Sequence, residues 1–270
     1  MKLGFIGGGN MAAALIGGLL ERGGSATDIT VAEPLAERRA WLAQTWGVAV
    51  EASAAGAAQA DVVVLAVKPQ VLQAVVRALP PLHPHQLLLS IAAGVRAADI
   101  ARWLGGHAAV ARAMPNTPAL VGEGVTGLYA LPGVSAAQRE QATQVMQAVG
   151  TALWVAEEGQ IDAVTAISGS GPAYVFLFIE ALEAAARELG LAADTARSLS
   201  LQTFYGAAAL AVRDSAPPAE LRARVTSKGG TTERGILALE QGGVRTVVAQ
   251  AARAAADRAH EMGELFGKDA

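Results

Sequence analysis

A glycine-rich stretch near the N-terminus, residues 7–12, has residue types and a spacing suited to binding phosphate groups. Gly7, Gly9 and Ala12 match the G-x-G-x-x-G/A pattern, between an apolar run and an amphipathic one. The first glycine permits a sharp turn, the second lets a pyrophosphate approach the backbone, and the small third residue lets the helix pack closely. We therefore expect a nicotinamide dinucleotide at Gly7, Gly8, Gly9, Asn10, Met11 and Ala12. The alternative is a glycine-rich turn that binds nothing.

An acid stands where such a site usually needs one. Glu33 follows the glycines by about twenty residues, after a second apolar run, and a carboxylate there binds the adenosine ribose hydroxyls. It favours NADH, because it repels the 2′-phosphate of NADPH, although Arg38 and Arg39 lie close enough in sequence to weaken that repulsion. The alternative is a solvated glutamate at a helix start, ahead of Pro34.

A second polar stretch late in the chain has the residues of an anion-binding loop. Backbone amides and hydroxyls stand just before a predicted helix start at Ser227, Gly229, Gly230, Thr231 and Thr232. The two glycines leave room for a ligand. The alternative is an ordinary helix N-terminus, in which a threonine ahead of Glu233 satisfies the end amides without any ligand.

The amino-acid composition argues against several other classes of function. The chain has no cysteine, which excludes disulfides and thiolate metal sites, and its four histidines lie outside every motif, so we expect no metal. A net charge of -3 without a long basic run argues against nucleic acid. Residues 78–95 and 163–179 are interrupted by Ser, Gly or Pro before reaching the ~20 apolar residues of a membrane span, and the early glycine turn leaves no room for a signal peptide. We expect a cytoplasmic protein without a membrane segment.

Short apolar runs alternate with helical stretches through the first half of the chain. The runs at residues 2–6, 29–32, 61–67 and 86–91 read as buried strands, and such alternation predicts a parallel sheet with crossover helices. Residues 108–111 and 125–130 extend that sheet, and residues 151–155 close it.

No strand is predicted after residue 161. Helices are predicted at residues 171–189, 192–212, 220–225, 231–240 and 243–266. The predicted fold class is therefore α/β, with a dinucleotide-binding domain at residues 1–160 and an all-helical domain at residues 161–270. The junction near residues 157–162 is expected to be a helical hinge.

Four segments, read with the glycine turn, carry a family resemblance. They are AVKP at residues 66–69, MPNTP at 114–118, SGSGPAY at 168–174 and VTSKGGTT at 225–232. In order and over nearly the whole chain they resemble pyrroline-5-carboxylate reductase, the last enzyme of proline biosynthesis. The most specific part is the SKGGTT loop followed by GILALE at 235–240. The resemblance implies an N-terminal Rossmann domain and a helical C-terminal dimerisation domain.

The resemblance also implies a path for the cofactor beyond the glycine turn. It implies that Ser53 lies near the adenosine and Asn116 near the nicotinamide. Between them the cofactor is lined by Ala66, Val67, Lys68, Pro69, Ala92, Ala93 and Gly94. These positions suit an open α/β sheet, which binds ligands beyond its strand ends. The alternative for Lys68 is a solvated lysine, and Pro69 can simply start a helix.

For the substrate, the resemblance implies that Thr232 sits by the ring nitrogen of a cyclic imine and is the catalytic residue. Ser227, Gly230 and Thr231 surround its carboxylate. Glu158 matches a position that contacts substrate, although a Glu-Glu pair at a helix start is commonly only a solvated cap. Lys228 departs from the family, in which many members have Pro, so the rigidity and charge of this loop can differ.

The implied activity is the reduction of 1-pyrroline-5-carboxylate to L-proline with NADPH or NADH. The implied partners are this cyclic imino acid and a second copy of the chain, bound through the C-terminal helices. The family often builds rings of such dimers, up to a decamer.

Two other functions stay open. A hydroxyacid-type NAD(P) dehydrogenase shares the two-domain plan but needs a catalytic base, and residues 168–174 contain neither Lys nor His. A non-catalytic dinucleotide-sensing module would keep the glycine turn and have no need of the loop at residues 226–232.

Overall fold

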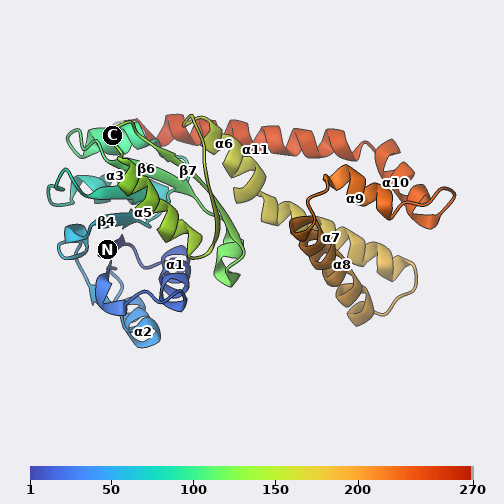
Figure 1. Cartoon of the computed structure of the whole chain (residues 1–270), viewed down its shortest axis with the longest axis horizontal. Coiled ribbons are helices and arrows are strands. Elements are labelled where there is room, and N and C mark those ends of the chain that lie inside the picture. Colours follow the sequence, from blue (N-terminus) through green and yellow to red (C-terminus); the bar gives the residue numbers. More distant parts are fainter. Residues whose placement is uncertain (269–270) are drawn as a thin grey trace. The chain divides into compact units, whose positions relative to one another are not determined.

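A computed structural model describes residues 1–268. Its N-terminal part is built on one sheet of eight strands in the order β3-β2-β1-β4-β5-β6-β7-β8. Figure 1 shows helices packed around this sheet. The strands are β1 (Leu3–Ile6), β2 (Ile29–Ala32), β3 (Ala49–Glu51), β4 (Val62–Leu65), β5 (Leu87–Ser90), β6 (Val110–Met114), β7 (Gly124–Ala130) and β8 (Gly150–Trp154). The predicted Rossmann-type sheet is confirmed.

Helices cover both faces of this sheet. Helices α1 (Asn10–Glu21), α2 (Ala36–Trp46) and α5 (Ala136–Gln147) pack with one set of strand side chains. Helices α3 (Pro69–Arg77) and α4 (Ala97–Trp103) pack with the other set. Every residue of β1, β4 and β5 is buried, because a strand covered on both faces has no solvent side.

The strand register aligns the segments that matter for binding. Ile6 at the end of β1 pairs with Ala32 at the end of β2 and with Leu65 at the end of β4. The residues that follow these three strands therefore emerge at one edge of the sheet. From β1 the chain adds β2 and β3 on one side, and it then returns to add β4 and the later strands on the other side. Sheets of this kind bind ligands at the point between β1 and β4 where the order of the strands reverses.

Two features of the sheet differ from the sequence prediction. Strand β3 was not predicted, since it has three residues and none of them is buried. Strand β7 pairs antiparallel with β6, whereas the others pair in parallel. The connection between β6 and β7, residues 115–123, holds only the short helix η3 (Thr117–Val121), and a parallel crossover needs about a dozen residues or more.

After β8 the described chain is helical, as predicted. The helices are α6 (Gln160–Val164), α7 (Gly171–Glu188), α8 (Ala193–Arg213), α9 (Pro218–Arg224), α10 (Thr231–Gln241) and α11 (Val244–Phe266). The chain forms two compact units, one of residues 171–252 and one of residues 1–170 with the end of α11 from Arg253. The domain boundary at residue 160 stays a prediction.

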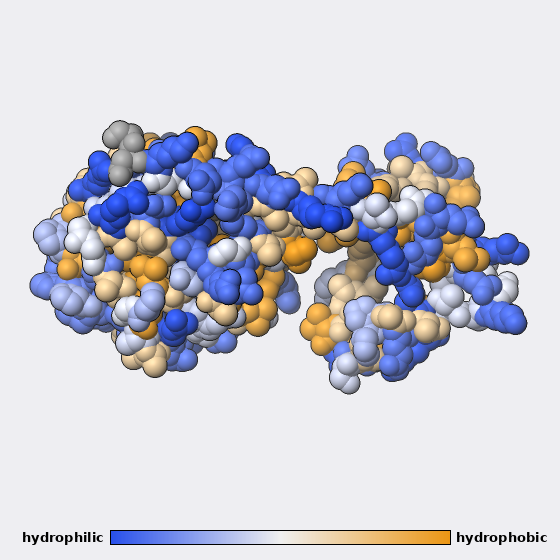
Figure 2. All heavy atoms as spheres, turned by 90° about the horizontal axis from the view of Figure 1, so that it is seen from above, coloured by the Kyte–Doolittle hydropathy of each residue, from blue (hydrophilic) through white to orange (hydrophobic). Residues whose placement is uncertain are grey.

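The expected interruption of the apolar stretch at residues 163–179 was wrong. A π-helical turn, Thr165–Gly169, joins α6 to α7, and the helical run Gln160–Glu188 is long and apolar enough to meet the length and composition of a membrane span. Pro172 does not break it, because it stands in the first turn of α7. Only 11% of its most apolar window is buried. Figure 2 shows apolar side chains at the surface of the helical unit.

Candidate functional site

The three glycines of the turn after β1 differ in the space around them. Gly7 has a φ of 101°, and a Cβ there would lie 2.6 Å from the carbonyl oxygen of Ala66. A Cβ on Gly8 would lie 2.5 Å from a methyl carbon of Leu42. Beside Gly9 nothing lies within 4 Å. The turn is therefore closed against β4 and α2 and open at Gly9, which leaves space for a ligand at the backbone.

Helix α1 begins directly at this opening. Its N-cap is Gly9, and no side chain caps it, so the first amides of the helix can bind a phosphate. Ala12 is 1% exposed, which allows the helix to lie close on the sheet.

Glu33 is held at the glycine turn. Its carboxylate accepts hydrogen bonds from the backbone N–H of Gly8 at 2.9 Å and of Leu35 at 3.0 Å. The residue is 8% exposed, so it is not a solvated helix-start glutamate. Each oxygen accepts one backbone donor and keeps a lone pair that can accept a ribose hydroxyl.

An open cleft lies along this edge of the sheet, with a volume of about 760 Å³. Of the predicted cofactor residues it brings together Gly7, Gly9, Glu33, Ser53, Ala66, Val67 and Lys68. Lys68 is exposed and Pro69 is the first residue of α3, so the predicted alternative for the proline also holds. The residues Ala92, Ala93, Gly94 and Asn116 lie outside this cleft.

The loop after β5 packs against the end of α11. Gly94 has a φ of 71°, and a Cβ there would lie 2.8 Å from the Cβ of Met262. Arg96 pairs with Glu264 at 2.6 Å. This ion pair lowers the pKa of the Glu264 carboxyl. The final turns of α11 therefore fix the backbone that carries Ala92, Ala93 and Gly94.

Glu158 joins three elements instead of capping its own helix. One carboxylate oxygen accepts the backbone N–H of Ala97, at the start of α4, at 2.6 Å. The same oxygen accepts from Arg112 on β6 at 2.8 Å, and the Arg112 side chain is 5% exposed. These contacts give Glu158 a visible structural role.

Asn116 uses both ends of its amide on the backbone. Its oxygen accepts the N–H of Val125 at 2.9 Å, and its nitrogen donates to the carbonyl oxygen of Ser168 at 3.1 Å. With 8% of its surface exposed, it ties the segment after β6 to β7 and to the π-helical turn.

The late polar loop ends at an uncapped helix N-terminus. Gly230 is the N-cap of α10 and makes no side-chain cap hydrogen bond. Glu233 reaches back to the N–H of Gly229 at 2.8 Å, and Gly229 has a φ of 75°. Thr231 and Thr232 are exposed in the first turn, so their hydroxyls and amides can meet an anion. The alternative, a threonine that caps the helix, does not form; Glu233 binds the loop instead.

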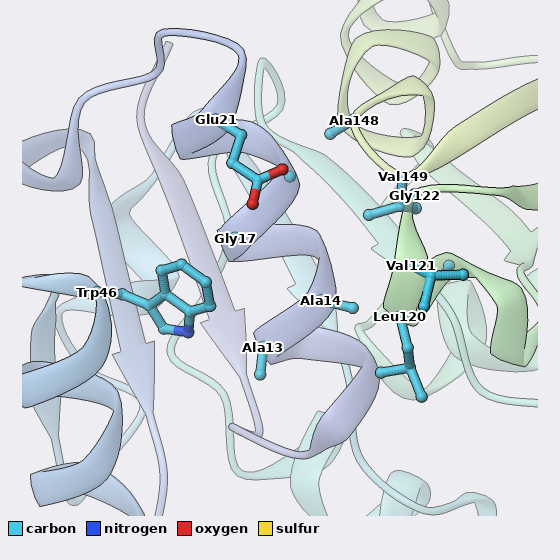
Figure 3. Close-up of a pocket in the computed structure, with 12 residues that line it drawn as sticks. Ala13, Ala14, Gly17, Glu21, Trp46, Leu120, Val121, Gly122, Ala148 and Val149 are labelled. Atoms are coloured by element: carbon cyan, nitrogen blue, oxygen red, sulfur yellow. The ribbon is translucent and has the colours of Figure 1, made fainter.

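Another pocket lies along α1, beyond its first turn (Figure 3). Gly17 lets the Trp46 ring approach the helix, since a Cβ there would lie 2.7 Å from a ring carbon. The pocket has a volume of about 270 Å³ and contains none of the predicted cofactor residues. The glycine turn and the larger cleft are therefore the better candidate for the cofactor.

The glycine turn has a second side, formed by Arg38, which the sequence had indicated as a neighbour of Glu33, and by Trp41, which it had not. Arg38 and Trp41 stand three residues apart on α2, a spacing that puts two side chains on one helix face. With Gly9 and Glu33 they line a cleft of about 450 Å³ that also includes Asn10, Leu35 and Glu37. Within residues 1–268, no group of three His, Cys, Asp or Glu side chains is placed to hold a metal ion.

Comparison with known proteins gives the family. A model described as pyrroline-5-carboxylate reductase dimerisation matches residues 158–262, and one described as NADP oxidoreductase, coenzyme F420-dependent, matches residues 2–94. A pyrroline-5-carboxylate reductase of Pseudomonas aeruginosa is 52% identical over 269 residues, which are 99% of this chain and 98% of that protein.

Solved structures agree with the sequence matches. That of a pyrroline-5-carboxylate reductase from Coxiella burnetii has a TM-score of 0.93 at 42% identity and covers 97% of this chain and 98% of its own. That of Plasmodium falciparum pyrroline carboxylate reductase with NADP bound has a TM-score of 0.85 at 30% identity, with the same coverage of 97% and 98%. The resemblance seen in the sequence is confirmed, and the chain belongs to the pyrroline-5-carboxylate reductase family.

Proposed function

We propose that this chain reduces the C=N bond of 1-pyrroline-5-carboxylate to give L-proline, the final step of proline biosynthesis, with NADPH or NADH. The observation that carries the proposal is the glycine turn, open at Gly9 on a cleft of about 760 Å³, in a chain that is 52% identical to such a reductase.

The cofactor site follows the strand ends. The pyrophosphate lies on the turn of Gly7, Gly8, Gly9, Asn10, Met11 and Ala12, which supplies the first amides of α1. Glu33 and Ser53 bind the adenosine side of the cleft. The rest of the cofactor runs along Ala66, Val67, Lys68 and Pro69 toward Ala92, Ala93, Gly94 and Asn116. The reduced nicotinamide supplies the hydride that the imine carbon receives.

The substrate carboxylate binds at the N-terminus of α10. Ser227, Gly229, Gly230 and Thr231 surround it, and the N-cap residue Gly230 makes no side-chain cap hydrogen bond. The carboxylate of Glu233, which accepts the N–H of Gly229, has to give up that bond if this amide binds the substrate. Thr232 donates or relays a hydrogen bond at the ring nitrogen. That nitrogen gains one proton, before or during the transfer of one hydride to the carbon. Because a protonated imine is already electrophilic, the protein needs to orient it and does not need a strong acid. Glu158 is the remaining candidate for a substrate contact.

The domain roles and assembly follow the same plan. Residues 1–160 bind the dinucleotide, and residues 161–270 bind substrate and form the dimer. A dimerisation model of the family covers residues 158–262, and α7 has no buried residue in one chain. We propose that a second copy, not lipid, covers its apolar side chains, that dimers assemble further into a decamer, and that the protein is cytoplasmic.

Oxidation of NADPH and NADH by the purified protein, with and without 1-pyrroline-5-carboxylate, tests this function. We expect oxidation that depends on the imine and yields proline. A hydroxyacid dehydrogenase would instead reduce NAD(P) with an alcohol, and a sensing module would bind cofactor without turnover. Either result would overturn the proposal.

A further inference from the structure

The segment of residues 52–56 joins β3 to the short helix η2 (Ala57–Gln59). Three of its residues, Ala52, Ser53 and Ala54, line the cleft of about 760 Å³. Ser53 is exposed. The position of this segment therefore decides which groups one side of the cleft offers to a ligand.

The carboxylate of Glu51, the last residue of β3, closes this segment into a loop. Its Oε2 accepts the N–H of Gly56 at 3.1 Å, and its Oε1 accepts the N–H of Ala57 at 2.6 Å. Gly56 leaves space for this contact, since a Cβ there would lie 2.6 Å from Oε2 of Glu51. Both oxygens thus satisfy N–H groups at the start of η2, in hydrogen bonds strengthened by the negative charge.

The elements on either side of the loop are fixed to the sheet. The carbonyl oxygen of Glu51 accepts the N–H of Glu33 at 2.9 Å. On the other side, the side chain of Gln86, 2% exposed, donates to the carbonyl oxygens of Ala58 at 2.8 Å and Ala60 at 2.6 Å. The Glu51 carboxylate therefore sets the shape of a loop that lies between two fixed supports.

Glu51 does not itself line the cleft, so any effect on a ligand there is transmitted by the loop. A ligand binds more tightly to a loop that is already ordered, because less conformational entropy is lost on binding. We infer that Glu51 is a positioning residue, which holds residues 52–55 so that Ser53 meets the adenosine end of the cofactor. The inference rests on the cofactor site of the proposed function and adds to it a residue that touches neither cofactor nor substrate.

Steady-state kinetics of Glu51→Ala test it. The KM for NADPH and the KM for NADH should each rise by about 10-fold, while kcat and the KM for 1-pyrroline-5-carboxylate stay within about twofold of the wild type. Glu51→Gln keeps one acceptor oxygen and should raise the cofactor KM less than Glu51→Ala does. A Glu51→Ala protein with a lower melting temperature and an unchanged cofactor KM would overturn the inference, since a purely structural role gives that result.

Asp61→Ala is the matched control. The Asp61 carboxylate also accepts a backbone N–H, that of Lys2 at 2.7 Å, but at the start of β1 and away from the cleft. This variant should lower the melting temperature and leave the cofactor KM within about twofold of the wild type. A cofactor KM raised equally in Asp61→Ala and Glu51→Ala would show a general loss of structure and would overturn the inference.

Binding of ADP-ribose, which contains the adenosine end of the cofactor and no nicotinamide, separates this inference from the proposed function. By calorimetry, the Kd of ADP-ribose should rise by about 10-fold in Glu51→Ala and by less than about twofold in Asp61→Ala. If the proteins show this binding pattern but no imine-dependent oxidation, the reductase proposal fails and this inference stands. Equal Kd values in the wild type, Glu51→Ala and Glu51→Gln would overturn it, as would a wild type that does not bind ADP-ribose.

Discussion

Thr232 is the residue on which the proposed chemistry depends most directly. It stands in the exposed first turn of α10, where a hydroxyl can reach a ligand held by the helix N-terminus. Thr232→Ala should lower kcat/KM for 1-pyrroline-5-carboxylate by about 10- to 100-fold, as expected for a lost hydrogen bond to the reacting group. The Kd of the cofactor should stay within about twofold. Steady-state kinetics and a fluorescence titration of the cofactor measure both.

The matched control for Thr232 lies in the same loop. Thr226 donates its hydroxyl to the carbonyl oxygen of Arg222 at 2.6 Å, so its removal should loosen only the end of α9. Thr226→Ala should keep a near-normal kcat. Unchanged kinetics in Thr232→Ala would remove Thr232 from the mechanism.

Glu33 holds the backbone of the glycine turn, and we propose that it also selects between the two cofactors. Glu33→Ser should relax the discrimination against NADPH, because it removes a negative charge near the 2′-phosphate. The same change frees the N–H groups of Gly8 and Leu35, so we also expect the free energy of unfolding to fall by about 1–3 kcal/mol. Cofactor titrations and urea unfolding measure the two effects. A titration without any change in relative affinity would contradict the selective role.

Some features of the glycine turn could be predicted from the sequence, and others depend on contacts between distant residues. The glycine spacing predicted the sharp turn at Gly7, where a positive φ and the carbonyl oxygen of Ala66 leave no space for a side chain. The binding of a cofactor there stays a prediction. The partners of Glu33 were not predictable, since its bond to Gly8 crosses 25 residues of sequence. The contribution of Trp41 was missed because its role depends on the position of Arg38 over its ring.

At the scale of elements, Glu158 connects α4, β6 and the start of α6. Glu158→Gln should lower the free energy of unfolding by about 2 kcal/mol, because it leaves the buried Arg112 without a charged partner. Glu157→Gln, at its exposed neighbour, is the control and should change stability little. Urea unfolding measures both variants. A normal stability with a raised KM for the imine would instead make Glu158 a substrate contact.

The ion pair between Arg96 and Glu264, at the end of α11, makes the stability of the fold depend on pH. Arg96 lowers the pKa of Glu264 below its ordinary value of 4.5, so this ion pair stabilises the fold above that pH and is lost as the pH falls through the lowered value. The contribution is small because both side chains are exposed. Urea midpoints of the wild type and Glu264→Gln should differ near neutral pH and converge as the pH falls through the lowered pKa of Glu264. Curves that stay apart in acid would contradict this.

The positions of the strands could be predicted from the local hydrophobic pattern, but the way the strands pair could not. The apolar runs of β1, β2, β4 and β5 were predictable because buried strands read as continuous apolar segments. The direction of β7 depends on the short connection before it, and the existence of β3 depends on its pairing with β2 at the edge of the sheet. Neither can be predicted from hydropathy. The π-helical turn likewise carries the helix past Gly169 and Gly171, where glycines had suggested an interruption.

At the scale of the whole molecule, the apolar side chains that α7 exposes in one chain are the proposed dimer interface. Phe176 is 65% exposed and Leu177 is 62% exposed in one chain. Phe176→Glu should convert a dimer into monomers at micromolar concentration, because it places a charge in the proposed interface. Sedimentation velocity measures this. Val121→Glu, at a residue 76% exposed in the other unit, is the control and should remain dimeric. A wild-type monomer, or a dimeric Phe176→Glu, would contradict the interface.

The central claim, that this chain transfers hydride to a cyclic imine, is tested most directly by isotope transfer. The purified protein is given 1-pyrroline-5-carboxylate and a reduced cofactor that carries deuterium at the reactive C4 position of the nicotinamide. We expect proline with one deuterium at C5, the carbon that was doubly bonded to nitrogen, as detected by mass spectrometry and NMR. Proline without deuterium, or cofactor oxidation without proline, would contradict it.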